Sequence, residues 1–248
     1  MVFIYDEIHD SFHNFKERYI FNLWKWKSVI HKNFIISATY NEASILVIEY
    51  LAELTNKKIR IIESKRTLFP EKQSSLHLHY SSSYWFKHDT PEIKNTIIDI
   101  VSRGKKLDIL CYSKSLALSL ISKDTEIGKK LKETYGEVKN CTSELISRQR
   151  PDDEEPTNQY DNELCNVGTN FKTGVSIKKE NHSFVIIMPP RATRLWFSNR
   201  YGIFSSGINS IIQAIARQRT KGEIHIILPH PNEFVYSSLT RIIHRLSI

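Results

Sequence analysis

The chain has few of the features that mark secreted, zinc-binding or membrane-spanning proteins. It contains three cysteines, Cys111, Cys141 and Cys165, which are far apart in the sequence. No Cys-x-x-Cys pair occurs, so a zinc site and a disulfide framework are both disfavoured. No apolar run approaches the roughly 18 residues that a membrane helix needs. Acidic residues among the first ten positions argue against a signal peptide, so we expect a cytoplasmic protein with no membrane partner.

The charge of the chain points to a polyanionic partner. There are 35 Lys and Arg against 27 Asp and Glu, which gives a formal net charge of +8 and a pI near 9.3. Nucleic acid is the commonest partner of such proteins. Many basic proteins bind no nucleic acid, however. Charge alone therefore favours neither a nucleic-acid-binding protein nor a basic protein without such a partner.

An apolar run at residues 1–5 ends in two adjacent carboxylates, Asp6 and Glu7, with His9 two positions later. At the end of a strand, the first carboxylate can hold Mg²⁺ and the second can orient water toward a phosphate. Two carboxylates there can also simply cap a following helix. A second apolar run, 34–36, leads into Ser37 and Thr39 about one strand–helix unit later.

Three further segments follow in the second half of the chain. Residues 107–113 have the pattern of a buried strand that ends in a small hydroxyl residue. Residues 167–177 combine a threonine and a glycine with a short apolar segment, and an expected strand at 184–188 follows them. Residues 213–219 carry Gln, Arg and Arg on an expected helix. A guanidinium group suits phosphate chemistry because its planar fork stabilises charge on phosphoryl oxygens.

In this order and at this spacing, the five segments resemble motifs of superfamily 2 helicases of the DExH type. They correspond to motif II (residues 6–9), motif III (34–39), motif IV (107–113), motif V (167–177) and motif VI (213–219). The resemblance covers almost the whole chain. It implies ATP-driven translocation along, or unwinding of, nucleic acid, with ATP and Mg²⁺ bound between two RecA-like domains. In motif II, the resemblance implies that Asp6 binds Mg²⁺, that Glu7 positions water and that His9 links the nucleotide site to motif VI. Interdomain coupling would fall to Ser37, Thr39 and Gly174, and contact with nucleic acid to Thr169. In motif VI, the residues implied to contact the triphosphate are Gln213, Arg217 and Arg219.

Motif VI departs from the usual family pattern. Ala216 stands where the family has glycine, and Arg219 comes two positions after Arg217 rather than three. This shorter form is closest to the helicases related to the herpesvirus origin-binding protein, which also occur in phages and mobile elements. This resemblance favours DNA as the partner. It also implies a location in the host-cell cytoplasm if the chain comes from a phage or mobile element. Since Gln213 and Arg217 share one face of a helix, we expect Arg217 rather than Arg219 to reach the triphosphate.

The sequence also lacks Gly-x-x-x-x-Gly-Lys-Ser/Thr, the loop whose N–H groups cradle phosphates. We therefore expect the C-terminal part of a helicase that hydrolyses ATP poorly by itself. The two alternatives are a non-catalytic RecA-like module that binds nucleic acid, and a subunit completed by a separate chain that supplies the phosphate loop.

The alternation of strands and helices predicts an α/β fold, with a RecA-like parallel sheet and helices on both faces. Residues 1–59 would be the C-terminal fragment of a first RecA-like domain, with an exposed sheet edge unless another chain covers it. Residues 60–248 would be a second RecA-like domain. Strands are expected at 1–6, 34–38, 58–63, 76–80, 107–113, 184–188 and 223–228, and helices at 10–32, 41–55, 91–103, from 114, around 213–219 and at 232–246.

Three other segments have competing interpretations. Residues 191–201 interleave arginines with aromatics, which suits either a single-strand-binding surface or a packed loop; the residues concerned are Arg191, Arg194, Trp196 and Arg200. His77 and His79 share one strand face and could hold a metal, but no third ligand is evident, so a polar strand face is preferred. The acidic, proline-flanked stretch 147–163 has the composition of a solvated loop.

Overall fold

The structure is a computed structural model of the 248-residue chain. It describes residues 1–6, 22–36, 42–55, 59–60, 62, 73–142, 160–169, 175–190 and 208–231, with the backbone alone at residues 6, 42–44 and 208–209. The chain divides into two compact units, Met1–Leu68 and Phe69–Ile248. Each unit is described by itself. The division expected at 59/60 stays a prediction.

The first unit contains a pair of parallel strands and one helix. The strands are β1 (Val2–Asp6) and β2 (Lys32–Ile36), in a register that runs from Val2 opposite Lys32 to Asp6 opposite Ile36. The helix is α2 (Glu42–Glu53). Its residue Leu51 is buried with Leu54 and Ile30, and Asn33 on β2 donates a side-chain hydrogen bond of 2.9 Å to the Leu51 carbonyl.

Two expectations fail in this unit. The helix expected at 10–32 does not reach its predicted end, because residues 22–24 are helical, residues 25–29 form turns and β2 begins at Lys32. Pairing of Lys32 with Val2 on β1 takes the last residue of the predicted helix into the strand instead. Residues 59, 60 and 62, which lie in the strand expected at 58–63, are not in a strand, and the rest of that segment is outside the described residues.

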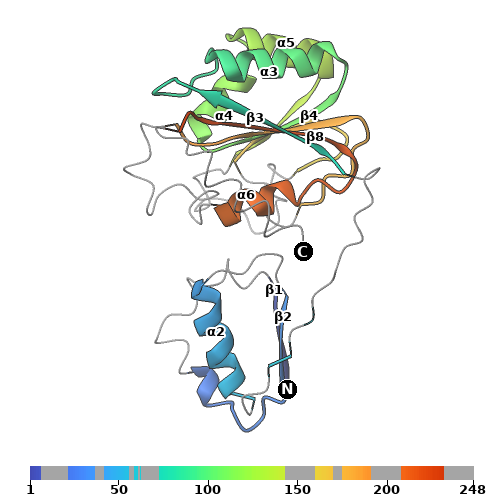
Figure 1. Cartoon of the computed structure of the whole chain (residues 1–248). Coiled ribbons are helices and arrows are strands. Elements are labelled where there is room, and N and C mark those ends of the chain that lie inside the picture. Colours follow the sequence, from blue (N-terminus) through green and yellow to red (C-terminus); the bar gives the residue numbers. More distant parts are fainter. Residues whose placement is uncertain are drawn as a thin grey trace, which may run out of the picture. The chain divides into compact units, whose positions relative to one another are not determined.

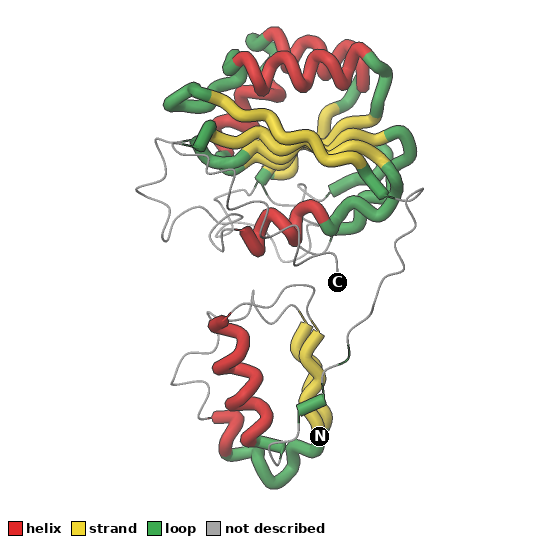
Figure 2. The backbone as a smooth tube through the Cα atoms, viewed as in Figure 1, coloured by secondary structure: helices red, strands yellow, loops and turns green. Residues whose placement is uncertain are grey.

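The second unit is a six-stranded, fully parallel sheet of order β3-β8-β7-β4-β6-β5 (Figures 1 and 2). The strands are β3 (Ser75–Ser81), β4 (Lys106–Cys111), β5 (Val138–Cys141), β6 (Cys165–Gly168), β7 (His182–Ile187) and β8 (Gly222–Pro229). The helices are α3 (Pro91–Ser102), α4 (Lys114–Ile121), α5 (Glu126–Tyr135) and α6 (Ile208–Ile215).

Helices cover both faces of this sheet. Figure 1 shows α3, α4 and α5 on one face and α6 on the other. The predicted α/β class, with a parallel sheet between helices, is therefore confirmed, and the arrangement is consistent with a RecA-like sheet. Within the described part of the chain, every helix is too short or too polar to cross a membrane.

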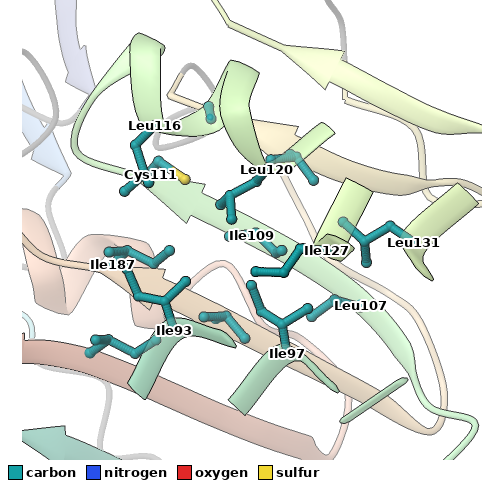
Figure 3. Packing of buried hydrophobic residues seen from close by; sticks show 14 of the residues in the cluster. Ile93, Ile97, Leu107, Ile109, Cys111, Leu116, Leu120, Ile127, Leu131 and Ile187 are labelled. Atoms are coloured by element: carbon teal, nitrogen blue, oxygen red, sulfur yellow. The ribbon is translucent and has the colours of Figure 1, made fainter. Parts of the chain in front are cut away.

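The larger core lies between the sheet and the three helices α3, α4 and α5 (Figure 3). Strand β4 sends Leu107, Ile109 and Cys111 into it, while Asp108 and Leu110 point to the α6 side. Each fully buried Leu or Ile side chain stabilises the fold by about 1.5–3 kcal/mol relative to exposure. Among the described residues, the α3–α5 side holds the larger apolar core, and the α6 side also carries the polar residue Asp108.

The hydroxyl residue at the end of the motif IV strand has a structural role. Ser113 is the N-cap of α4 and accepts a hydrogen bond from the Leu116 amide at 3.4 Å. Thr125 caps α5 in the same way, accepting from the Gly128 amide at 3.1 Å. Such caps satisfy amides that have no partner within the helix.

Candidate functional site

The carboxyl ends of β1 and β2 lie side by side in the first unit. Asp6 ends β1 and is paired with Ile36, which ends β2. The last residues of the two strands therefore lie at the same edge and the same level of the strand pair. His9 and Thr39 follow within three residues. Glu7, His9, Ser37 and Thr39 are outside the described residues, as is the side chain of Asp6, so the Mg²⁺ site predicted there stays a prediction.

The segment that resembles motif V, residues 167–177, begins on β6, next to the edge strand β5 of the second unit's sheet. Gly168 ends β6, and a Cβ atom at this position would lie 2.1 Å from the Cys141 carbonyl oxygen on β5, so only glycine fits. Thr169 follows at once and donates its amide to the Cys141 carbonyl at 3.1 Å. Thr169 thus stands at the carboxyl edge of the sheet. Gly174 is outside the described residues.

The end of this segment is hydrogen-bonded to residues 217–219, which lie in the segment that resembles motif VI. Ile177 forms a parallel bridge with Gln218. The Ile177 amide donates to the Arg217 carbonyl at 2.9 Å, and the Arg219 amide donates to the Ile177 carbonyl at 2.9 Å. Two segments that are about forty residues apart in the sequence are therefore held together by their backbones.

Helix α6, which carries Gln213, buries polar atoms without satisfying them. Gln213 and Ser210 are one turn apart, and both are fully buried. Neither the amide group of Gln213 nor the hydroxyl of Ser210 has a hydrogen-bond partner among the described residues. A buried polar group without a partner costs about 1–3 kcal/mol. Each such group calls for an explanation, such as an ordered water, an ion or a ligand that satisfies it.

The two arginines of motif VI differ in their surroundings. Helix α6 ends at Ile215, and a turn continues it through Arg217, whose amide donates to the Ala214 carbonyl at 3.1 Å. The bridge to Ile177 follows directly after this turn. Arg217 is only 8% exposed and its Nε donates to the Gln213 carbonyl at 3.2 Å, whereas Arg219 is exposed. Arg219 is thus the more accessible of the two cations.

The arginine- and aromatic-rich segment cannot be placed. Arg191, Arg194, Trp196 and Arg200 are all outside the described residues, and their predicted contact with nucleic acid stays a prediction.

A buried ionic network on the α6 side was not predicted from the sequence. Its centre is Asp108 on β4, which is fully buried. The Oδ1 atom of Asp108 accepts from Lys179 Nζ at 2.7 Å and from the Asn166 amide and side chain at 3.0 and 2.8 Å. Its Oδ2 atom accepts from the Tyr160 hydroxyl at 2.7 Å and lies 2.9 Å from His182 Nε2. Tyr160 therefore belongs to the core, although its stretch of sequence has the composition of a solvated loop.

This Asp108 network is continuous with the motif VI segment. His182 Nδ1 lies 2.9 Å from Gln218 Oε1, and the Thr220 hydroxyl donates to the Lys179 carbonyl. Burial by itself would raise the pKa of Asp108, but the His182 contact and the positive charge of Lys179 outweigh it, so the pKa lies below its usual value. The carboxylate is therefore ionised. The network fixes residues 179–182 and 218–220 to strand β4.

A second cluster contains the two histidines that the sequence analysis considered as metal ligands. His79 Nε2 lies 3.0 Å from Nδ1 of His225 on β8, and the His77 ring stacks on His225 with centroids 4.6 Å apart. His225 Nε2 lies 3.2 Å from Glu223 Oε2. Across the described ranges, no three His, Cys, Asp or Glu side chains are arranged to hold a metal ion. The stacked rings form a polar strand face.

The three cysteines are buried thiols, and Cys141 Sγ donates to Asn166 Oδ1 at 3.5 Å. Burial raises the pKa of Cys141 to about 12 and also raises the pKa values of Cys111 and Cys165, so all three are unreactive thiols at neutral pH.

Comparison with known proteins adds no further assignment. No protein-family model matches the chain, and neither a curated protein nor a solved structure matches it.

Proposed function

We propose that this chain is the C-terminal part of a superfamily 2 helicase or translocase, which acts on nucleic acid with ATP and Mg²⁺ and favours DNA. The observation that carries the proposal is the backbone pairing of Ile177 with Arg217 and Arg219. It brings the segments that resemble motifs V and VI together, on the face of the parallel sheet that is covered by α6. A motor of this class needs these two segments to act as one unit, since one contacts nucleic acid and the other contacts the nucleotide.

The unsatisfied amide of Gln213 supports the same proposal. In a protein without a ligand at this position, a leucine or methionine at position 213 would remove the cost of burying an unpaired amide. In the proposed role, the amide is satisfied by the nucleotide or by an element that moves with it. The exposed Arg219 and the buried Arg217 would then supply positive charge toward the phosphates.

The chain alone should hydrolyse ATP slowly or not at all. Phosphoryl transfer depends on positioning and electrostatic stabilisation, and the 248 residues include no phosphate loop. The first test is steady-state ATP hydrolysis by the purified chain, with and without single-stranded DNA or RNA. Binding of the same oligonucleotides is measured in parallel, at several salt concentrations.

The expected result is salt-sensitive binding of single strands with little hydrolysis. Arg219→Ala should lower the salt dependence of binding or of any hydrolysis, while Lys221→Ala, a neighbouring exposed cation, is the matched control. Strong hydrolysis that Glu7→Gln abolishes would show that the chain builds the motor site by itself and would contradict the expected inactivity. Absence of binding to either nucleic acid at low salt would overturn the proposal.

A subunit completed by a separate chain is the second candidate, and an exposed apolar face favours it. Val2 and Ile4 on β1 and Phe34 and Ile36 on β2 share one face of the strand pair, and each is at least half exposed. Parallel sheets are normally covered on both faces. The partner would be a chain with a Gly-x-x-x-x-Gly-Lys-Ser/Thr loop. Co-expression with such a chain should restore hydrolysis, and Ile4→Glu should prevent assembly while Leu118→Glu, an exposed control on α4, should not.

A further inference from the structure

The segment that joins β3 to α3, residues 82–90, holds two large aromatic side chains in solvent. Tyr84 is 61% exposed and Trp85 is 57% exposed. Their rings meet edge to face, with centroids 5.6 Å apart and planes at 86°. Two adjacent exposed aromatic rings form a small contiguous apolar patch, a feature that binding surfaces use.

The neighbouring residues hold these aromatics in place. Phe86, the next residue, is buried in the core beneath α3. The Lys87 amide donates to the Thr90 hydroxyl at 2.9 Å, and the Thr90 amide donates to the Lys87 carbonyl at 3.1 Å. The backbone on the C-terminal side of Trp85 is thus anchored to the core. Little ordering of this part of the backbone is then needed when a ligand stacks on the two rings, which favours binding.

The loop stands at the edge of the sheet where ligands of open parallel sheets bind. It follows the carboxyl end of β3, and Thr169 of the motif V segment follows the carboxyl end of β6. Four strand spacings separate β3 from β6 in the order β3-β8-β7-β4-β6, a distance of about 19 Å. A ligand that contacts both must be extended, as a single strand of nucleic acid is.

We propose that Tyr84 and Trp85 form a base-stacking platform for single-stranded nucleic acid, at the opposite end of a path that begins at Thr169. The platform rests on the proposed function, which supplies the nucleic acid. Every base has a π face, so the contact tolerates any sequence. The charges of Lys87 and Asp89 in the same loop offset each other, so the platform contributes stacking rather than neutralisation of phosphates.

The test measures binding of a fluorescently labelled oligothymidine of 20 nucleotides by anisotropy, at four salt concentrations, to the full chain. Trp85→Ala should weaken binding by about 5- to 100-fold, and Trp85→Phe, which keeps an aromatic face, should weaken it less. The slope of log K against log salt should not change, because no phosphate contact is removed. Trp26→Ala is the control, since Trp26 is 54% exposed in the other unit and should bind as the parent does.

The outcomes separate the platform from the function on which it rests. If the parent chain binds and Trp85→Ala binds equally well, the platform is wrong and the proposed function stands. If the parent chain does not bind at low salt, the proposed function is wrong and the platform falls with it. An equal loss in Trp26→Ala, or a reduced salt slope in Trp85→Ala, would also overturn the platform. Thermal melts of the variants confirm that each is folded.

Discussion

Two carboxylates on opposite faces of the same sheet each gather a lysine and a histidine, yet their surroundings differ. Asp108, on the α6 face, has a fully buried side chain, and its partner Lys179 is 2% exposed. Glu223, on the α3 face, is 17% exposed and pairs with Arg103 and Lys105, which are exposed to 36% and 20%. The same chemical groups are therefore shielded from water in one cluster and reached by water in the other.

The difference in burial decides what each cluster does. Asp108 takes most of its hydrogen bonds from neutral groups and has one ionic partner, as a dry carboxylate requires. Glu223 accepts from two cations, a serine and a histidine, and water can replace any of them. The Asp108 network specifies one arrangement of the segments around motif VI, while the Glu223 cluster adds electrostatic stability at the sheet edge.

The largest effect is expected from Asp108→Ala. Removal of this carboxylate leaves the Lys179 ammonium buried without its counter-ion, which costs about 3–5 kcal/mol in the free energy of unfolding. Urea denaturation followed by circular dichroism measures this loss.

The matched control for this prediction removes both charges. Asp108→Leu combined with Lys179→Met should recover much of the lost stability, because no unpaired charge remains in the interior. A double variant as unstable as Asp108→Ala would show that the hydrogen bonds of Asn166 and Tyr160, rather than the charge of Lys179, dominate.

The contrast between the clusters also shows what the sequence could and could not reveal. Strands β4, β7 and β8 were predicted, because burial on both faces leaves them a mostly apolar pattern. Strands β5 and β6, with four residues each, and helix α5 were not predicted, since short polar-containing segments carry little periodicity.

The Asp108 network was missed for a related reason. Lys179 and His182 stand in a stretch of polar residues that has the composition of a surface turn, and their burial depends on contacts with β4 that lie about seventy residues away. The one local sign was Asp108 itself, a charged residue inside an apolar strand. Gln213 was identified from a motif, but its unsatisfied burial could only come from the three-dimensional structure.

Glu223→Gln should have the next largest effect, about 2 kcal/mol in the free energy of unfolding. Burial raises the pKa of Glu223, but the hydrogen bonds from Arg103 and Lys105 outweigh this and hold the pKa below its usual value. The loss is smaller than for Asp108 because Arg103 and Lys105 can turn to water when the charge is removed. Chemical denaturation at neutral pH measures it, and a loss as large as that of Asp108→Ala would remove the distinction between the two clusters.

The stability of the Glu223 cluster should depend on pH through His225. Burial lowers the pKa of His225 to about 4, against about 6.5 in an unfolded chain, and the pKa of His79 is also lowered by burial. The unfolded chain binds more protons between these values, so stability is complete above about pH 6.5 and falls as the pH drops toward 4.

A loss of about 1.8 kcal/mol between pH 7 and pH 5 is expected, measured as the urea midpoint at each pH. His225→Gln removes the titrating group, and its midpoint should vary less over the same range. Equal pH dependence in both proteins would assign the effect to other groups.

The smallest effect is expected at the surface, where Lys94 on α3 meets Glu126 on α5. Their N–O distance of 2.7 Å is as short as that of Lys179 and Asp108, but the side chains are 35% and 67% exposed. Water screens the pair, so Glu126→Gln should change the free energy of unfolding by no more than about 0.5 kcal/mol. A double-mutant cycle with Lys94→Met isolates the pair, and its coupling should shrink further in 1 M salt. A coupling above about 1.5 kcal/mol would mean that distance rather than burial sets the strength of the ionic contacts in this fold.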